Sequence, residues 1–299
     1  MAATSSEALA LAYGECETLI RHGDRDRWLA SLFTPLPVRR HLHALYAFNF
    51  EIARVREIVS DPLPGEVRYQ WWRDALEGEA RGDVHGHPVA AAVIDTIVRF
   101  RLPRKAFTSL IEAREFDLYD DPMPTLRDLE GYCGETSSGL IRLASLVLSE
   151  GRECGSAEAA GHGGVAYAIA GLLRALPWHS ARGQLYLPMD VLTRHGVTRS
   201  EIVAGNATPA LRAVLAEMRQ EARQHLQATR SCIRTLEPAT AAAFLPLSLV
   251  EPYLRRMERR GYEPFKTVID IPEWQRQWCL WRAARQAARH GRKAMKRGR

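Results

Sequence analysis

The sequence predicts an all-α protein. Residues 87–100, 164–176 and 209–229 place apolar side chains at helical spacings. The alternation of apolar and polar residues that is typical of strands is not sustained between turn signals. Prolines cluster between the helical runs, as the pairs Pro35 and Pro37, Pro62 and Pro64, and Pro122 and Pro124. We expect them to end or start helices, because a proline inside a helix removes an amide donor and crowds the preceding turn.

Size and composition predict one large domain with a short appendage. The 299 residues are 46% hydrophobic, enough for one large core, and no linker argues for two domains. We expect a helical domain at residues 1–272 and a Trp-containing basic helix or tail at residues 273–299. Five cysteines form no CxxC pair, which indicates neither a disulfide framework nor a zinc site and favours a reducing compartment.

The C-terminal end is basic and aromatic. Residues 282–299 hold eight Arg or Lys and no acid, so the rest of the chain carries −2 of the formal net charge of +6. Trp274, Trp278 and Trp281 share one helix face, which we expect to dock on the body, with a lipid interface as the alternative. This end is expected to bind anionic membrane surface weakly, although it also suits a solvated, partly disordered tail. It lacks a recognition fold for nucleic acid.

Targeting and membrane-spanning signals are lacking in the sequence. The longest apolar stretches are too short and too often interrupted by arginine to cross a bilayer. The first twenty residues carry Glu7, Glu15 and Glu17, unlike a secretory or transit peptide. We expect a soluble, unprocessed protein.

Two segments carry a family resemblance. Residues 39–57 read RRHLHALYAFNFEIARVRE, and residues 172–188 read LLRALPWHSARGQLYLP. With FDLYDDPMPTLRDLEGYC at residues 116–133 and GHGGVAYAIAGLLRAL at residues 161–176, they resemble the squalene/phytoene synthase family of prenyl transferases in order and spacing. The resemblance covers most of the chain. It implies an isoprenoid synthase-type helical bundle around a central cavity, with the substrate's diphosphate at the cavity mouth.

The resemblance also shows what this sequence lacks. Family members use two DxxxD motifs, whose paired carboxylates hold Mg²⁺ against the diphosphate leaving group. The first pair falls here on Ala53 and Glu57, and the second on Ala175 and His179, with Pro177 between them. Only Glu57 could still coordinate a metal. We therefore predict no catalytic residue and no metal ligand at these degenerate positions.

Small residues replace the polar rim of the second motif. Ala168 and Gly171 stand where the family usually has Gln and Asn, and with Ala175 they form a small, apolar stripe. Small residues can either widen a pocket or let helices close and fill it, and both possibilities remain open at this point.

Other patterns are assigned structural roles. A literal DxxxD runs from Asp117 to Asp121, but Pro122 follows it, so we interpret it as an acidic helix end. His41 and His43 are two residues apart and therefore suit surface or packing positions better than a metal site. The glycines at 161, 163 and 164 follow no strand, and close helix packing explains them better than a phosphate loop does.

The leading functional prediction is a non-catalytic protein. Within the family, the chain resembles a divergent branch that includes the mitochondrial assembly factor for respiratory complex I and its bacterial relatives. This implies a scaffold or assembly factor for NADH:quinone oxidoreductase, with complex I subunits or assembly intermediates as partners and no cofactor. The composition suggests a bacterial member. The expected location is the bacterial cytoplasm, with peripheral contact at the inner membrane, or the mitochondrial matrix in a eukaryote.

Two alternatives remain open. The first is an active prenyl-diphosphate transferase of isoprenoid biosynthesis, in which Arg40, Glu57, Arg174 and Arg182 bind the diphosphate together with Mg²⁺. The second is a carrier whose inherited cavity holds an isoprenoid, a quinone or another lipid. A carrier function is compatible with a scaffold role.

Overall fold

The computed structural model describes residues 2–80, 84–233 and 236–297, and in this part of the chain every regular element is a helix. Side chains are described except for residues 2–5, 85 and 290–297. The elements of the first half are α1 (Ala2–Gly23), α2 (Arg25–Ser31), α3 (Leu36–Ala53), α4 (Val55–Ile58), α5 (Pro62–Glu77), η1 (Val84–Gly86), α6 (Pro88–Phe100), α7 (Arg104–Arg114), η2 (Glu115–Leu118), α8 (Leu126–Cys133), η3 (Gly134–Ser138) and α9 (Gly139–Leu148). Those of the second half are α10 (Ala157–Arg174), α11 (Leu176–Ala181), α12 (Met189–Arg194), α13 (Arg199–Val203), α14 (Pro209–Cys232), η5 (Pro238–Thr240), α15 (Ala241–Phe244), η6 (Leu245–Leu249), α16 (Val250–Arg256) and α17 (Glu273–Arg297).

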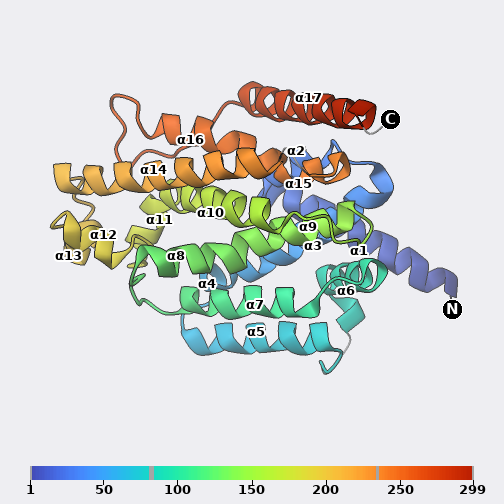
Figure 1. Ribbon diagram of the computed structural model, residues 1–299. Coiled ribbons are helices and arrows are strands. Elements are labelled where there is room, and N and C mark those ends of the chain that lie inside the picture. Colours follow the sequence, from blue (N-terminus) through green and yellow to red (C-terminus); the bar gives the residue numbers. More distant parts are fainter. Residues whose placement is uncertain (1, 81–83, 234–235, 298–299) are drawn as a thin grey trace.

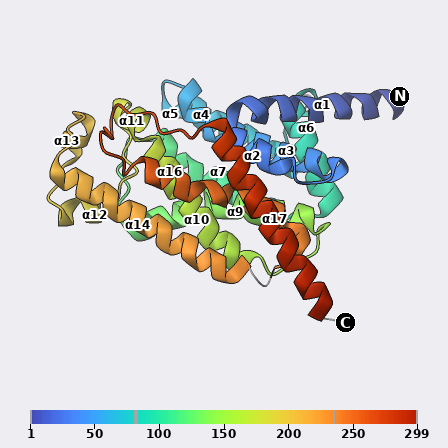
Figure 2. The ribbon, with the colours of Figure 1, turned by 90° about the horizontal axis from the view of Figure 1, so that it is seen from above.

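The helices form a layered bundle. Helices α10 and α14 lie side by side along it, and α8, α9 and α3 continue it below them (Figure 1). Helix α7 and then α5 close the opposite side, while α17 lies on the outside against α2, α15 and η6 (Figures 1 and 2). The N-terminal end of α1 extends beyond the bundle in both views. Aromatic side chains fill the core, where the Phe48 ring lies 5.2 Å from that of Trp72 and 5.4 Å from that of Phe107.

Local sequence signals account for most helix boundaries. The run at residues 87–100 forms α6, where the His87 side chain accepts a hydrogen bond from the Ala90 amide. The run at residues 209–229 lies within α14. Pro35 is the N-cap of α3 and Pro62 is the first residue of α5, so these prolines start helices as predicted. The run at residues 164–176 is helical as predicted except at Ala175, because α10 ends at Arg174 and a new helix begins at Leu176.

Close helix packing explains two of the three central glycines. A Cβ atom on Gly164 would lie 2.3 Å from the backbone nitrogen of Ser138, and one on Gly163 would lie 2.7 Å from the Leu247 side chain. The predicted close packing is therefore confirmed at both positions. A Cβ on Gly161 would meet nothing within 4 Å. Because of this approach, α10 lies directly against η3, a π-helical segment that joins α8 to α9.

Helix α17 docks through a face that the sequence did not single out. Its Arg276 and Leu280 are 4% and 1% exposed, and the Arg276 guanidinium donates to the Asp26 carboxylate at 2.7 Å. Trp274 and Trp278 are 70% and 51% exposed. The predicted docking of the tryptophan face is therefore wrong. Arg276 lies about 200° around the helix from Trp278, so burying one face leaves the other in solvent.

His41 and His43 are packing residues, one of the two roles expected for them. His41 is fully buried, and its Nδ1 lies 2.9 Å from the Tyr13 hydroxyl. His43 is 2% exposed, and its Nε2 lies 2.9 Å from the Ser31 hydroxyl. Burial lowers the pKa of both histidines to about 4, so both are neutral at pH 7.

Candidate functional site

The first motif segment is interrupted by a break between two helices. Ala53 is the last residue of α3, and Glu57 belongs to the short helix α4. Arg54 joins the helices with φ −86° and ψ −3°, in the bridge region of backbone conformations. The two former aspartate positions therefore lie in different helices, separated by this one residue.

The second motif segment is broken in the same way. Helix α10 ends at Arg174, and Ala175 joins it to α11 with φ −85° and ψ 0°. Pro177 lies at the start of α11 and cannot donate the amide hydrogen that would continue α10. His179 follows in the new helix. The backbone is thus irregular in both segments, although the His179 amide still donates to the Ala175 carbonyl at 3.0 Å. The missing carboxylates are therefore the main loss at these positions.

An ion pair joins the two segments. The Arg182 guanidinium, at the C-terminal end of α11, lies 3.9 Å from the Glu57 carboxylate. The side chains are 47% and 60% exposed, so water screens the interaction. A guanidinium from the second segment thus approaches Glu57, the one carboxylate left at the former aspartate positions of the first. This contact places a positively charged side chain beside Glu57.

A second ion pair lies beside the first. Arg56 is 3.5 Å from the carboxylate of Asp120, and the Arg199 guanidinium donates to the Asp120 carbonyl at 2.7 Å. Arg56 of the first motif segment therefore contacts a protein acceptor, and the Arg54 guanidinium lies over the Phe50 ring at 5.4 Å.

The literal DxxxD does not form a metal site. Asp117 is 3% exposed, and its carboxylate accepts hydrogen bonds from the Tyr132 and Tyr186 hydroxyls at 2.8 and 2.7 Å. The Arg114 guanidinium donates to the other carboxylate oxygen at 3.0 Å. Asp121 is exposed in the loop that follows η2, so the two carboxylates do not share a helix face. Asp117 is thus a buried structural acid.

His179 contacts the hydrogen-bonded network around Asp117 through Tyr186. Its ring centroid is 4.6 Å from that of Tyr186, and burial lowers the pKa of His179 to about 4. A cavity of about 20 Å³ adjoins it, with room for roughly one water molecule. The cavity is lined by Leu129, Ile169, Leu172, Leu173, Leu176, His179, Gln184, Tyr186, Leu187 and Met218. A neutral imidazole in this setting can neither hold a diphosphate by charge nor coordinate hard Mg²⁺ well.

The predicted diphosphate-binding residues are not gathered at one place. Arg174 lies over the Tyr253 ring at 3.8 Å and donates to the Ile269 carbonyl at 3.3 Å. Arg40 lies over the Tyr13 ring at 4.9 Å. The structure therefore brings Glu57 and Arg182 together, while Arg40 and Arg174 each contact other elements.

The small-residue stripe borders open space rather than a close helix contact. Ala168, Gly171 and Ala175 are half-buried, and a Cβ on Gly171 would meet nothing within 4 Å. Of the two possibilities that the sequence left open, close approach of a neighbouring helix does not apply at Gly171.

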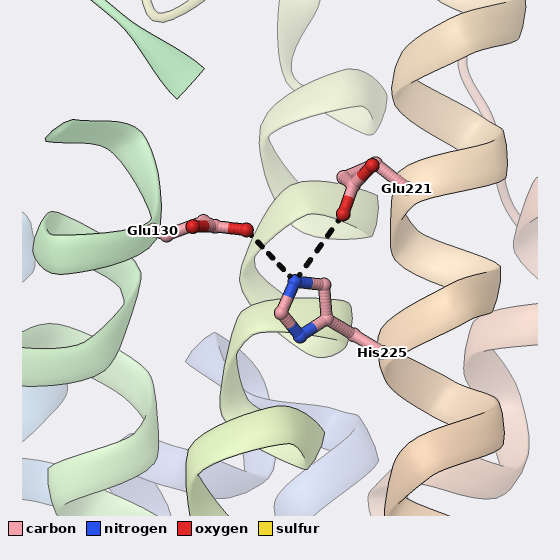
Figure 3. A group of neighbouring side chains, drawn as sticks. All are labelled: Glu130, Glu221 and His225. Atoms are coloured by element: carbon pink, nitrogen blue, oxygen red, sulfur yellow. Dashed lines mark hydrogen bonds and ion pairs between the residues drawn. The ribbon is translucent and has the colours of Figure 1, made fainter. Parts of the chain in front are cut away.

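The sequence interpretation missed a group of possible metal ligands. Glu130 on α8 and Glu221 and His225 on α14 point toward one another (Figure 3). Within the described residues this is the group of three that could hold a metal ion, and none of its members belongs to either motif segment. The spacing of Glu221 and His225, one helical turn, was the signal available in the sequence.

Fold and site together define the class: an isoprenoid synthase-type bundle whose two metal-binding segments have lost their aspartates. Residues 20–282 match the squalene/phytoene synthase family. The chain belongs to this family.

Similar proteins include both assembly factors and synthases. A rat protein, NADH dehydrogenase (ubiquinone) complex I, assembly factor 6, is 33% identical over 89% of this chain and 79% of its own length. A phytoene synthase of Arthrospira platensis is 25% identical over 90% of this chain and 91% of its own length. Among solved structures, squalene synthase HpnC from Alicyclobacillus acidocaldarius has a TM-score of 0.72 at 25% identity, covering 86% of this chain and 97% of that one.

Across the described residues, the longest helices fall short of the length and apolarity that a bilayer crossing requires.

Proposed function

We propose that this protein is a non-catalytic member of its family that acts as a scaffold or assembly factor for respiratory complex I. Its likeness to complex I assembly factor 6 supports the role. The partners would be subunits or assembly intermediates of the complex. No substrate chemistry is required for this role, because a rigid helical surface is sufficient for binding.

The observation that carries the proposal is the Glu57 and Arg182 ion pair. Ionisation of an allylic diphosphate needs cations that neutralise the charge developing on the leaving group. Here the remaining carboxylate is paired with a guanidinium, and Ala53, Ala175 and His179 hold the other motif positions. Without a binding site for Mg²⁺, the charge that develops on the diphosphate loses its main source of stabilisation.

Two experiments test the proposal. Purified protein with farnesyl or geranylgeranyl diphosphate and Mg²⁺ should form no product, while the phytoene synthase of Arthrospira platensis serves as the positive control. Deletion of the gene should lower the amount of mature complex I on a native gel. Expression of Glu57→Ala should restore the complex as well as the wild type does. Product formation that Glu57→Ala abolishes would contradict the proposal.

Neither alternative is favoured by a specific contact. An active transferase would need Arg40, Arg174 and Arg182 around one diphosphate, and these side chains have separate protein partners. A carrier would need room for an isoprenoid chain, and the cavity beside the second motif is about 20 Å³. A larger hollow of about 360 Å³ beside α14 is lined by several charged residues, which suit an apolar chain poorly.

We further propose peripheral contact with an anionic membrane through α17. The exposed tryptophan face favours it, because indole rings are most stable at the boundary between headgroups and acyl chains. Arg282, Arg285 and Arg289 are exposed on the same helix and add attraction to anionic lipid. The side chains of residues 290–299, which hold the rest of the basic tail, lie outside the described residues. A place at the inner face of a bacterial membrane, or in the mitochondrial matrix of a eukaryote, suits this contact.

A further inference from the structure

Three ligand atoms converge between α8 and α14. The His225 Nε2 atom lies 3.0 Å from Glu130 Oε1 and 3.5 Å from Glu221 Oε1, and all three ligand atoms lie within 4.8 Å of one another (Figure 3). The side chains of Glu130, Glu221 and His225 are 35%, 20% and 14% exposed. The group is therefore accessible to ions from solvent but partly shielded from water.

The spacing fits a small divalent ion. Zn²⁺ binds imidazole nitrogen and carboxylate oxygen at about 2.0–2.2 Å, so two ligand atoms of a tetrahedral site lie roughly 3.3–3.6 Å apart. The observed distances of 3.0 and 3.5 Å need only small side-chain movements to reach this geometry. The set of one imidazole and two carboxylates is also one that first-row divalent metals accept.

The position of His225 favours a cation over a simple hydrogen bond. Its Nε2 faces two carboxylates at once, yet a single N–H can donate a good hydrogen bond to only one of them. Elsewhere, His195 Nε2 faces the carboxylate of Glu217 at 2.7 Å, and Arg194 shares that carboxylate. The two sites differ in the second carboxylate, which gives the cluster on α8 and α14 an excess of negative charge.

A second histidine orients the first. The His162 Nδ1 atom on α10 lies 2.9 Å from His225 Nδ1, so one ring donates to the other. With His225 as the donor, its Nε2 lone pair is left for a metal, and metal-binding histidines are typically held in this way. The close approach of α10 at Gly163, where a Cβ would lie 3.3 Å from the Thr229 side chain on α14, brings His162 to this position.

We propose that Glu130, Glu221 and His225 form a site for a divalent transition metal of the Zn²⁺ class, which links α8 to α14. Three protein ligands leave a fourth position, which a water molecule would fill. The site is separate from the two degenerate motif segments. It goes beyond the sequence-based expectation that the protein binds no cofactor.

Zn²⁺ titration of the full chain, depleted of metal by a chelator, tests the proposal. One Zn²⁺ per chain should bind, and binding should raise the thermal midpoint of the wild type. Glu221→Gln and His225→Asn should each weaken Zn²⁺ by more than about 100-fold, because removing an orienting residue alone costs about 10–100-fold. His162→Phe should fall in that smaller range. His195→Asn is the matched control and should bind as the wild type does.

Co²⁺ absorption distinguishes this site from cysteine ligands. Cobalt held by nitrogen and oxygen should lack the thiolate charge-transfer bands that binding at any of the five cysteines would produce. Circular dichroism of each variant checks folding, and Glu130→Gln supplies a third substitution if one of the others fails to fold. No uptake of Zn²⁺ by the wild type, retained affinity in Glu221→Gln and Glu130→Gln, or thiolate bands would each overturn the proposal.

Discussion

The guanidinium of Arg182 lies 3.9 Å from the carboxylate of Glu57, and the two residues come from segments that are 125 positions apart in the chain. In active relatives these segments are expected to present aspartates that share Mg²⁺. Here an intramolecular ion pair replaces that arrangement. The interaction leaves no unpaired acid at either motif position.

The ion pair should contribute little to stability. In a double-mutant cycle with Glu57→Ala and Arg182→Ala, we expect a coupling free energy of about 0.2–1 kcal/mol, because both side chains are about half exposed. Urea unfolding of the four proteins measures it, and added salt should reduce it further. A coupling several times larger would mean that the pair is shielded from water.

Substitution of Gly164 should be costly, whereas that of its neighbour Gly161 should not. In Gly164→Ala the new Cβ would meet the Ser138 backbone at 2.3 Å, so α10 and η3 must move apart, at a cost of about 1–3 kcal/mol or more. Gly161→Ala has open space and should stabilise α10 by about 0.5–1 kcal/mol. Urea unfolding of both variants provides the measurement. Equal effects would contradict the close contact.

The free energy of unfolding should fall as the pH is lowered, because His43 stays neutral in the folded protein. Burial lowers the pKa of His43 to about 4, against about 6.5 in an unfolded chain. Between these values the unfolded state binds the proton and the folded state does not. The free energy of unfolding is therefore fully retained above about pH 6.5 and loses up to about 3 kcal/mol by pH 4 through this residue.

His43→Gln removes that titration. The slope of unfolding free energy against pH should become shallower than in the wild type by as much as one proton over the same range. His41 and His179 titrate in both proteins, so the test is the difference between the two slopes. Identical slopes would show that His43 takes up its proton without unfolding.

The tryptophan face should govern vesicle binding. Replacing Trp274, Trp278 and Trp281 by alanine should weaken binding to phosphatidylglycerol vesicles at least about tenfold, because the partial burial of three indoles is worth more than 1.4 kcal/mol. Cosedimentation measures it. Removing α17 by truncation at Pro272 would be a less specific test, because it would also expose the surface of the helical bundle that Arg276 and Leu280 cover.

Arginine substitutions on the same helix separate charge from apolar burial. Replacing Arg282, Arg285 and Arg289 by glutamine should reduce mainly the salt-sensitive part of the binding. Unchanged binding in both triple variants would exclude the tryptophan face and these three arginines as the membrane contact.

The sequence by itself determined the helical class, many helix boundaries and the loss of the motif aspartates. These features are local: apolar spacing predicts helices such as α6 and α14, and Pro35, Pro62 and Pro177 act through their own rings and missing amide hydrogens. Residue identity at Ala53 and Ala175 can be read without coordinates once the family resemblance is recognised. Pro177 also predicts the irregular backbone of the second segment, whereas the sequence does not reveal the break at Arg54 between α3 and α4.

Only the tertiary structure decided which faces are covered and which distant side chains meet. Helical spacing shows that Trp274, Trp278 and Trp281 share a face, but not that Arg276 on another face finds Asp26, 250 residues away. The same holds for Glu57 with Arg182 and for Glu130 with His225, which are 95 residues apart. The sequence pattern specifies neighbours along one helix, whereas contacts between helices depend on how all of them pack around the shared core.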